Sequence, residues 1–186
     1  MKKEALRKKF ILKRNGMSKK EVAEYSELIT DKILNLDTIK KAKTILAYFP
    51  YGNEVSTKKI IDVCLNSGKT VCLPVCMKND NLEAYQIKNY HEELIKNKNY
   101  KILEPDIGKC QKVDVNTLDV VLVPGVAFDK NKHRLGHGKG FYDRFLCRLS
   151  SNTVIIGVCY DWQITKNDLP IDDNDKPVNV VVTEIN

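Results

Sequence analysis

The sequence has no apolar run that approaches the roughly 20 residues needed to cross a bilayer. Charged residues make up 30% of its 186 positions. The opening stretch, MKKEALRKKFILKRNG, threads basic residues through its apolar ones and has neither an apolar core segment nor a small-residue cleavage site. Lysine also dominates over arginine there, which argues against a transit peptide. We therefore expect no membrane partner and no secretory signal.

Cysteine pairs are also missing. The six cysteines are scattered, without the paired framework that stabilises small secreted domains, so a cytoplasmic location is expected. Cys72 and Cys76, with His133 and His137, are residue types that bind zinc, but a spacing of four on a strand does not fit a zinc knuckle.

The general nucleotide-binding and hydrolase motifs are absent. The chain contains no GxxxxGK[ST] loop, no GxGxxG fingerprint and no GxSxG nucleophile elbow. A P-loop enzyme, a standard dinucleotide-binding domain and a serine hydrolase of that type are therefore not supported.

Basic charge is distributed unevenly. The formal net charge is +7, yet residues 1–20 hold nine Lys or Arg and one Glu, for +8, which leaves −1 for the other 166 residues. A uniformly basic nucleic-acid binder would look different, so no nucleic-acid partner is expected. An RNA- or anion-binding protein that uses the basic first helix remains an alternative.

The pattern of apolar residues predicts one α/β domain over residues 1–186. With 42% hydrophobic content, the chain can bury a single core. Short apolar runs alternating with helical patterns are typical of a mostly parallel sheet covered on both faces. The expected helices are 3–15, 18–36, 55–66 and 141–149, and the expected strands are 44–49, 70–75, 82–85, 119–124, 153–158 and 178–182.

Two local signals refine this outline. Ser18 followed by Glu21 is a capping-box signature that predicts the start of the second helix. Residues 86–117 are polar and irregular, with 102–105 as their only compact feature. Because loops of that length usually carry function or wrap a surface, we expect this segment to cover part of the substrate cleft.

The segment RLGHGKGFYDR, residues 134–144, is the strongest candidate for a functional site. It places three glycines around Lys139, after a strand and before a helix, which is where ligands bind in open α/β sheets. Glycine lets the backbone approach an anion closely, and Lys139 and Arg134 supply positive charge. The segment therefore predicts phosphate binding, with a flexible glycine turn as the alternative.

The first helix supports a phosphate site. At about 100° per residue, Lys3, Arg7 and Arg14 fall on the same side as Phe10, toward the protein. The alternative is that the basic side chains snorkel to water along their apolar stems. If a nucleotide lies beneath this helix, Lys3 and Arg7 reach its phosphates.

Carboxylates lie near both candidates. Asp143 follows the glycines within one helical turn, and Asp172, Asp173 and Asp175 precede the last strand. Near phosphates, such groups suggest Mg²⁺, although an ordinary acidic turn also explains the latter three. Glu54 follows the first strand and can accept N–H donors of a polar ring, or it is a helix N-terminal charge favoured by the dipole.

Together, five fragments resemble the 5-formyltetrahydrofolate cyclo-ligase family, also called 5,10-methenyltetrahydrofolate synthetase. They are KEALR (3–7), NEVST (53–57), ILEP (102–105), PGVAFD (124–129) and RLGHGKGFYDR (134–144). Their order and spacing match over nearly the whole chain. The resemblance implies a three-layer α/β/α fold with a mostly parallel sheet, similar to the NagB/RpiA/CoA-transferase group.

The resemblance also implies an activity, which is the ATP- and Mg²⁺-dependent cyclisation of 5-formyltetrahydrofolate to 5,10-methenyltetrahydrofolate with release of ADP and phosphate. The formyl oxygen attacks the γ-phosphate, N10 closes the ring and phosphate leaves. A sugar-phosphate isomerase or acyl-CoA enzyme of the same broad fold is a further alternative, and it would not require ATP. The expected partner is the small-molecule folate, with or without a polyglutamate tail, and the expected state is a monomer.

The resemblance assigns roles to individual residues. Lys139, Arg134 and Tyr142 are the implied catalytic residues. The implied ATP contacts are Lys3, Arg7, Arg134, Leu135, Gly136, His137, Gly138, Lys139, Gly140, Phe141 and Tyr142. The implied folate contacts are Phe49, Glu54, His137, Gly138, Lys139, Gly140 and Phe141. The implied Mg²⁺ ligands are Asp143 and Asp173.

Four positions depart from the family pattern. Phe141 stands where the family often has a second tyrosine, and His137 stands where it has a basic or aromatic residue. Asn174 and Asn179 stand where the family frequently has His and then Asp. The Phe141 change removes a hydroxyl and with it any hydrogen bond that the hydroxyl makes to substrate.

Overall fold

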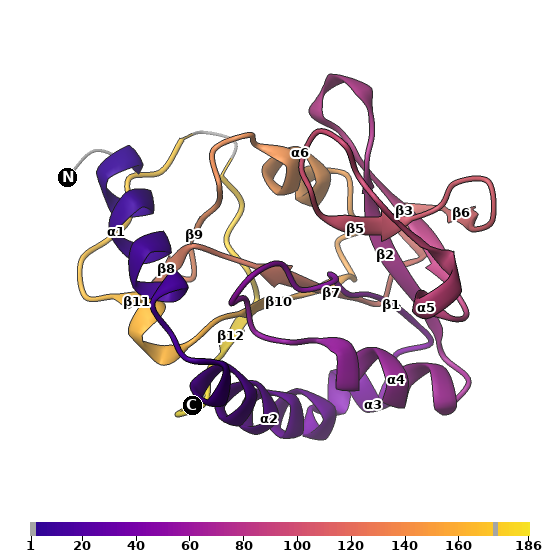
Figure 1. Cartoon of the computed structure of the whole chain (residues 1–186), viewed down its shortest axis with the longest axis horizontal. Coiled ribbons are helices and arrows are strands. Elements are labelled where there is room, and N and C mark those ends of the chain that lie inside the picture. Colours follow the sequence, from indigo (N-terminus) through magenta and orange to yellow (C-terminus); the bar gives the residue numbers. More distant parts are fainter. Residues whose placement is uncertain (1–2, 173–174) are drawn as a thin grey trace.

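The computed structural model describes residues 3–172 and 175–186, and it is organised around one seven-stranded sheet (Figure 1). Five neighbouring strands run parallel, and the last two are antiparallel. The strand order is β12 (Val180–Val182), β10 (Val154–Val158), β7 (Val120–Pro124), β1 (Thr44–Leu46), β2 (Thr70–Cys76), β3 (Leu82–Ile87) and β6 (Gln111–Val113). This is the mostly parallel sheet that the sequence predicts.

Two small sheets accompany the large one. The first contains β11 (Ile164–Thr165), β8 (Ala127–Asp129) and β9 (Arg134–Leu135), and the second pairs β4 (Leu94–Lys96) with β5 (Leu103–Pro105). β8 and β9 form an antiparallel hairpin directly after β7, the strand that ends at Pro124. This hairpin carries the chain from the central sheet to the glycine-rich segment.

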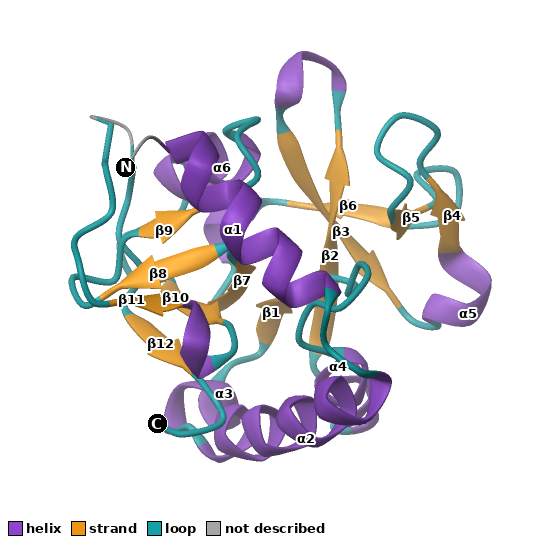
Figure 2. Cartoon of the chain, turned by 60° about the vertical axis from the view of Figure 1, so that its left-hand side comes forward, coloured by secondary structure: helices purple, strands orange, loops and turns teal. Residues whose placement is uncertain are grey.

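The helices lie on both sides of the sheet (Figures 1 and 2). They are α1 (Lys3–Asn15), α2 (Lys19–Asn35), α3 (Asp37–Lys41), α4 (Lys58–Asn66), α5 (Tyr90–Glu93) and α6 (Phe141–Cys147), with 3₁₀ turns η1 (Lys78–Asp80), η2 (Val115–Thr117) and η3 (Asp161–Gln163). Within the described part of the chain, none of these helices combines the length and apolar character needed to cross a bilayer.

One face of the sheet packs against α2, α3 and α4. Ile29 and Ile33 of α2 and Ile60 of α4 are fully buried against apolar side chains of the central strands. The capping box predicted for α2 is present, since the Ser18 side chain accepts from the Glu21 amide and the Glu21 carboxylate accepts from the Ser18 amide. These helices form the first outer layer.

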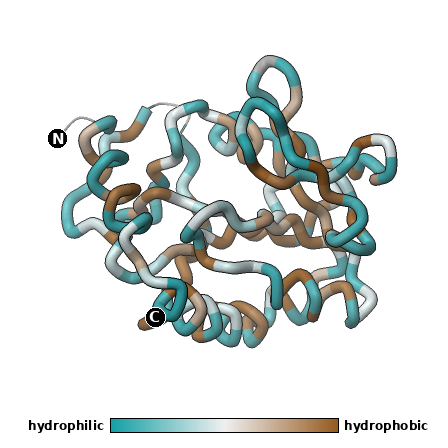
Figure 3. The backbone as a smooth tube through the Cα atoms, viewed as in Figure 1, coloured by the Kyte–Doolittle hydropathy of each residue, from teal (hydrophilic) through white to brown (hydrophobic). Residues whose placement is uncertain are grey.

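The other face packs against α6. Phe145 and Leu146 are fully buried against strand side chains that point away from the first layer. The tube coloured by hydropathy shows brown apolar stretches along the central strands and teal hydrophilic stretches over outer turns (Figure 3). The two apolar faces explain why the strands read as continuous apolar runs in the sequence.

Helix α1 stands apart from both layers and lies across the β8–β9 hairpin (Figure 2). Its apolar residues Leu6, Phe10 and Ile11 pack on a small core formed by β8, β9 and the segment around Leu169. This packing fixes which side of α1 faces the protein. Because Lys3, Arg7 and Arg14 share that side, the packing turns three cations inward.

Three predictions of local structure were wrong, two about where an element begins or ends and one about an irregular segment. The strand expected over 44–49 ends at Leu46, although the Ala47 amide still bonds to the Cys72 carbonyl. The helix expected from residue 55 begins at Lys58, because the Thr57 hydroxyl donates to the Tyr48 carbonyl and holds the preceding loop against β1. The segment 86–117 is not irregular, since it contains α5, β4, β5, β6 and η2.

Candidate active site

A cleft of about 330 Å³ opens where β1, β2 and β7 end. These strands are parallel, so their carboxyl ends meet at one edge of the sheet, which is the usual ligand-binding edge of open α/β sheets. The residues that line the cleft are Tyr48, Phe49, Tyr51, Glu54, Leu73, Pro74, Cys76, Leu82, Tyr100, Ile102, Leu103, Pro124, Arg134, Gly136, His137, Gly138, Lys139, Gly140, Phe141, Tyr142 and Asp143. Most of the predicted site residues are therefore brought together.

The glycine-rich segment forms one wall of this cleft. Gly138 has φ of +98° and Gly140 has φ of +68°, both in the left-handed region that favours glycine. The Arg144 guanidinium donates to the carbonyl of Lys139 at 2.8 Å and to that of Asp80, which ties the loop to the β2–β3 turn. The Lys139 ammonium is exposed and makes no ion pair with any residue that the structure describes. It is thus a free cation at the cleft wall.

Arg134 lies beneath the glycine loop. Its side chain is only 5% exposed, and its Nη2 donates to the Asp143 carboxylate. Its guanidinium also lies over the Tyr142 ring, 5.3 Å from the ring centre. Its Nε is buried and has no hydrogen-bond partner among the described residues. The side chain is therefore a buried cation whose hydrogen bonds are incomplete.

Tyr142 contributes a neutral hydroxyl to the cleft. Burial, and next the negative charge of Glu54, raise the pKa of Tyr142 well above its usual value, and the Arg134 charge only partly offsets them. The phenol therefore stays protonated across the physiological range. Its chemistry is that of a hydrogen-bond donor and acceptor without charge.

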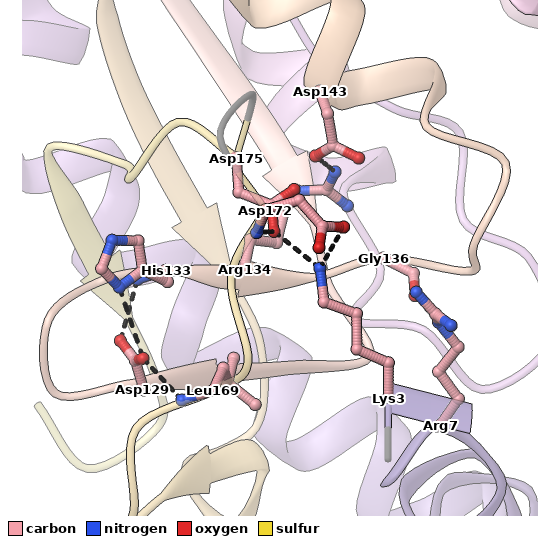
Figure 4. A network of polar contacts seen from close by, with 10 residues as sticks. All are labelled: Lys3, Arg7, Asp129, His133, Arg134, Gly136, Asp143, Leu169, Asp172 and Asp175. Atoms are coloured by element: carbon pink, nitrogen blue, oxygen red, sulfur yellow. Dashed lines mark hydrogen bonds and ion pairs between the residues drawn. The ribbon is translucent and has the colours of Figure 1, made fainter. Parts of the chain in front are cut away.

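Two cations of α1 reach the far side of the glycine loop (Figure 4). Arg7 donates from Nε to the Gly136 carbonyl at 2.8 Å. Lys3 lies between two carboxylates, with its Nζ 2.7 Å from Asp172 and 2.8 Å from Asp175. Lys3, Arg7 and Leu135 do not line the cleft itself. They support the loop from behind.

The Lys3 contacts also shift the pKa values of these groups. Burial opposes ionisation, yet the hydrogen bonds that Lys3 donates to both carboxylates raise the pKa of Lys3 above its usual value. Burial raises the pKa of Asp175, but the hydrogen bond from Lys3 and the neighbouring charges outweigh burial and hold that pKa below its usual value. Both charged forms are therefore favoured by the pairing.

Glu54 lies at the opposite side of the cleft, where the loop after β1 meets α1. Its carboxylate accepts from the Tyr51 amide at 3.1 Å and lies 3.4 Å from Nη1 of Arg14. Nε2 of His137 is 3.7 Å away, so the glycine loop also approaches this carboxylate. The predicted folate contacts Phe49, Glu54 and His137 all line the cleft.

The carboxylates proposed for a metal are only partly described. Asp143 lines the cleft and pairs with Arg134. Asp173, the other predicted ligand, and Asn174 lie outside the described residues. In the described ranges, no group of three or more His, Cys, Asp or Glu side chains is arranged to hold a metal ion. The described side chains alone therefore do not form a complete metal site.

Sequence reasoning missed several cleft residues. Tyr48, Cys76 and Tyr100 line the cleft but stand in no recognised motif. Position was the available signal for the first two, because they follow or end buried strands at the ligand-binding edge. Tyr100, with Ile102 and Leu103, comes from the segment that was expected to cover the cleft, and these three residues do line it.

The positions that depart from the family pattern have clear surroundings. The Phe141 ring packs edge-on against Tyr100, with ring centres 5.3 Å apart. The Tyr100 hydroxyl is 3.2 Å from Asp80. Asn179 accepts from the Ile155 amide at 2.7 Å, which joins β10 to the chain leading into β12. Asn179 therefore has a structural role at the sheet.

Known proteins resemble this chain over nearly its whole length. A family model described as the 5-formyltetrahydrofolate cyclo-ligase family matches residues 1–184. The probable 5-formyltetrahydrofolate cyclo-ligase of Schizosaccharomyces pombe is 34% identical over 168 residues, covering 83% of this chain and 81% of that protein. The 5-formyltetrahydrofolate cyclo-ligase of Escherichia coli K12 is 31% identical over 174 residues, covering 92% and 94%.

Solved structures agree. The 5,10-methenyltetrahydrofolate synthetase of Aquifex aeolicus superposes with a TM-score of 0.86 at 34% identity, covering 100% of this chain and 91% of that one. The Mycoplasma pneumoniae synthetase superposes with a TM-score of 0.81 at 25% identity, covering 99% of each chain. The chain therefore belongs to the 5-formyltetrahydrofolate cyclo-ligase family.

Proposed function

We propose that this protein converts 5-formyltetrahydrofolate to 5,10-methenyltetrahydrofolate and uses ATP to do so. One observation carries the proposal: the glycine loop separates two sets of groups suited to two substrates. Arg134, Lys139 and Arg7 supply cations around the loop, while Glu54 faces the same cleft from the end of β1. Cations suit a triphosphate, and a carboxylate suits a ring that presents N–H donors.

The reaction has a simple atom balance. The formyl oxygen attacks the γ-phosphorus, and the bond from that phosphorus to ADP breaks. N10 then attacks the former formyl carbon and releases its proton, and the C–O bond breaks so that the oxygen leaves with inorganic phosphate. An amide-like oxygen leaves poorly until it is phosphorylated, which is why ATP is needed.

The cations would act on the phosphoryl group. Phosphoryl transfer depends mainly on positioning and on charges aimed at the transferred oxygens. Lys139 is exposed at the cleft wall, which leaves its ammonium available to the γ-phosphate. Arg134 is held from below by Asp143, and its orphaned Nε indicates a place for one more acceptor. Tyr142 would donate its hydroxyl proton in a hydrogen bond without losing it.

Mg²⁺ fits the donors on this side of the loop. Asp143 offers a carboxylate at the cleft, and Asp175 lies close enough to Arg134 to interact with it electrostatically. Mg²⁺ typically takes one or two carboxylates and completes its shell with phosphate oxygens and water. We assign Asp143 as a ligand, beside the Asp173 that the family resemblance implies. The ion would neutralise phosphate charge.

The folate would occupy the apolar half of the cleft. Phe49, Leu73 and Phe141 provide flat or apolar surface there, and Glu54 provides an acceptor at its base. Phe141 has no side-chain hydroxyl, so its ring would hold the folate by apolar contact, without a hydrogen bond. The proposed partner is the small-molecule folate, with or without a polyglutamate tail, and the proposed state is a monomer.

The two alternatives fit less well. A nucleic-acid binder would present the cations of α1 outward, whereas three of its six cations, Lys3, Arg7 and Arg14, contact other parts of the protein. An isomerase or acyl-CoA enzyme of similar fold would work without ATP. Omitting ATP from the assay separates that class from the proposed one.

The test is to mix the protein with Mg-ATP and 5-formyltetrahydrofolate and follow the absorbance of the conjugated methenyl product. Wild-type protein should give product only when ATP is present. Lys139→Ala should lose nearly all turnover while keeping its fold. Lys130 is an exposed lysine on the β8–β9 hairpin, and Lys130→Ala should keep full turnover. No product from folded wild-type protein would overturn the proposal, and full activity in Lys139→Ala would overturn the role of Lys139.

A further inference from the structure

A buried ion pair lies next to the cleft, between α1 and the loop after β1. The Arg14 side chain is 6% exposed and the Glu54 side chain is 10% exposed, with Nη1 and Oε1 3.4 Å apart. Glu54 lines the cleft, but Arg14 does not. Arg14 therefore reaches the site through its ion pair with Glu54.

Stability alone does not explain this pair. Removing two charges from water is costly, and replacing a buried ion pair by apolar residues of similar volume is often neutral or stabilising. The Arg14 Nε is also buried without a partner among the described residues, which adds to the cost. The pair is better explained by what it does to the position of the Glu54 carboxylate.

The contacts around Glu54 fix its carboxylate on both oxygens. The Tyr51 amide donates to Oε2 at 3.1 Å, while Oε1 lies near Arg14 at 3.4 Å and His137 at 3.7 Å. His137 is exposed and belongs to the glycine loop, so Arg14 is the buried cation that holds Oε1. Without it, the carboxylate would keep one firm contact.

The loop that carries Glu54 is also fastened to the end of α1. The Asn53 side-chain amide donates to the carbonyls of Arg14 and Met17, each at 3.0 Å. The Tyr160 hydroxyl donates to the Asn53 carbonyl at 3.1 Å. The C-terminal end of α1 and the loop at residues 51–54 therefore form one connected unit.

We infer that Arg14 is a positioning residue for Glu54, whose carboxylate it holds oriented at the base of the cleft so that folate can bind. The inference rests on the proposed function, because it assigns the folate to the Glu54 side of the cleft. The same helix carries Lys3 and Arg7 on the nucleotide side, so α1 contacts both halves of the site. Arg14 serves the folate half.

The experiment compares KM values for the two substrates in wild-type protein and three variants. In Arg14→Gln, KM for 5-formyltetrahydrofolate should rise about tenfold, the scale seen when a group that orients a ligand-binding side chain is lost. KM for ATP should change by less than about twofold. Arg14→Lys keeps the charge and should recover part of the folate affinity. Lys8→Gln, an exposed cation on the same helix, is the matched control.

The outcomes are distinct. A wild-type protein without turnover would refute the proposed function itself. An active wild type with unchanged folate KM in Arg14→Gln, even if that variant melts earlier, would show that Arg14 is only structural. Should Arg14→Gln fail to fold, Arg14→Lys decides: a folate KM raised about threefold or more supports the role, and an unchanged KM overturns it.

Discussion

Gly138→Ala tests the geometry of the glycine loop most sharply. Gly138 has φ of +98°, so any side chain there is strained, by about 1–2 kcal/mol for the left-handed region. A Cβ at this position would lie 3.3 Å from Cζ and 3.4 Å from Nη1 of Arg7. Arg7 is flexible enough to move, but moving it stretches its 2.8 Å hydrogen bond to the Gly136 carbonyl.

The expected loss of ATP affinity follows from the second cost, because the strain is present in the free and the ATP-bound protein alike and lowers only stability. A hydrogen bond with a charged donor is worth about 1.5 kcal/mol at the low end, and Arg7 is only half-buried. Loss of this contact should reduce the ATP affinity about tenfold. Calorimetric titration with Mg-ATP in the absence of folate measures it directly.

Gly68→Ala provides the matched control. Gly68 has φ of +76°, but a Cβ there would meet nothing within 4 Å, and the residue follows α4 away from the cleft. This variant should lose about 1–2 kcal/mol of stability and bind ATP as wild type does. ATP affinity within twofold of wild type in Gly138→Ala would refute the contact between the loop and Arg7.

Three further predictions concern the core, the α1 contacts and the thiols. Phe145→Ala, which empties a fully buried position under the sheet, should lower the free energy of unfolding in urea by about 3–5 kcal/mol, and a loss below about 1 kcal/mol would contradict the packing. Because the pKa of Asp175 lies below its usual 3.8 and that of Lys3 above its usual 10.5, their contact should stabilise α1 between these values. Amide hydrogen exchange of residues 3–7 should therefore become faster as the pH falls below the pKa of Asp175, by more than the intrinsic pH dependence of exchange accounts for. Lys3→Gln should abolish this extra change. Burial, with Glu104, raises the pKa of the half-buried Cys76 to about 12, so iodoacetamide at pH 8 should label it far more slowly than the exposed Cys147; equal rates would contradict this raised pKa.

Local signals in the sequence predicted the elements whose causes are local. The capping box at Ser18 and Glu21 involves residues three apart, and the structure confirms it. The helix of residues 3–15 and the buried strands also follow from short-range pattern. The inward side of α1 was predicted from helical spacing, with snorkelling as the open alternative, and Arg14 is buried in an ion pair.

Features that depend on distant partners were beyond reach. β4 and β5 pair with each other, and β6 pairs with β3, so each is defined by residues elsewhere in the chain. The contacts of Lys3 with Asp172 and Asp175 span about the whole sequence. Tyr100 approaches Phe141 only because the β4–β5 segment folds over the cleft. No pattern of neighbours encodes such approaches.

The route of the formyl oxygen is the most direct test of the central claim. If the formyl oxygen of the substrate attacks the γ-phosphate, substrate labelled with ¹⁸O in the formyl group should give inorganic phosphate that carries the label, with one labelled oxygen for each methenyl product. Mass spectrometry of the phosphate measures this after a single turnover. Unlabelled phosphate alongside methenyl product would contradict the phosphorylation of the formyl oxygen in this cleft.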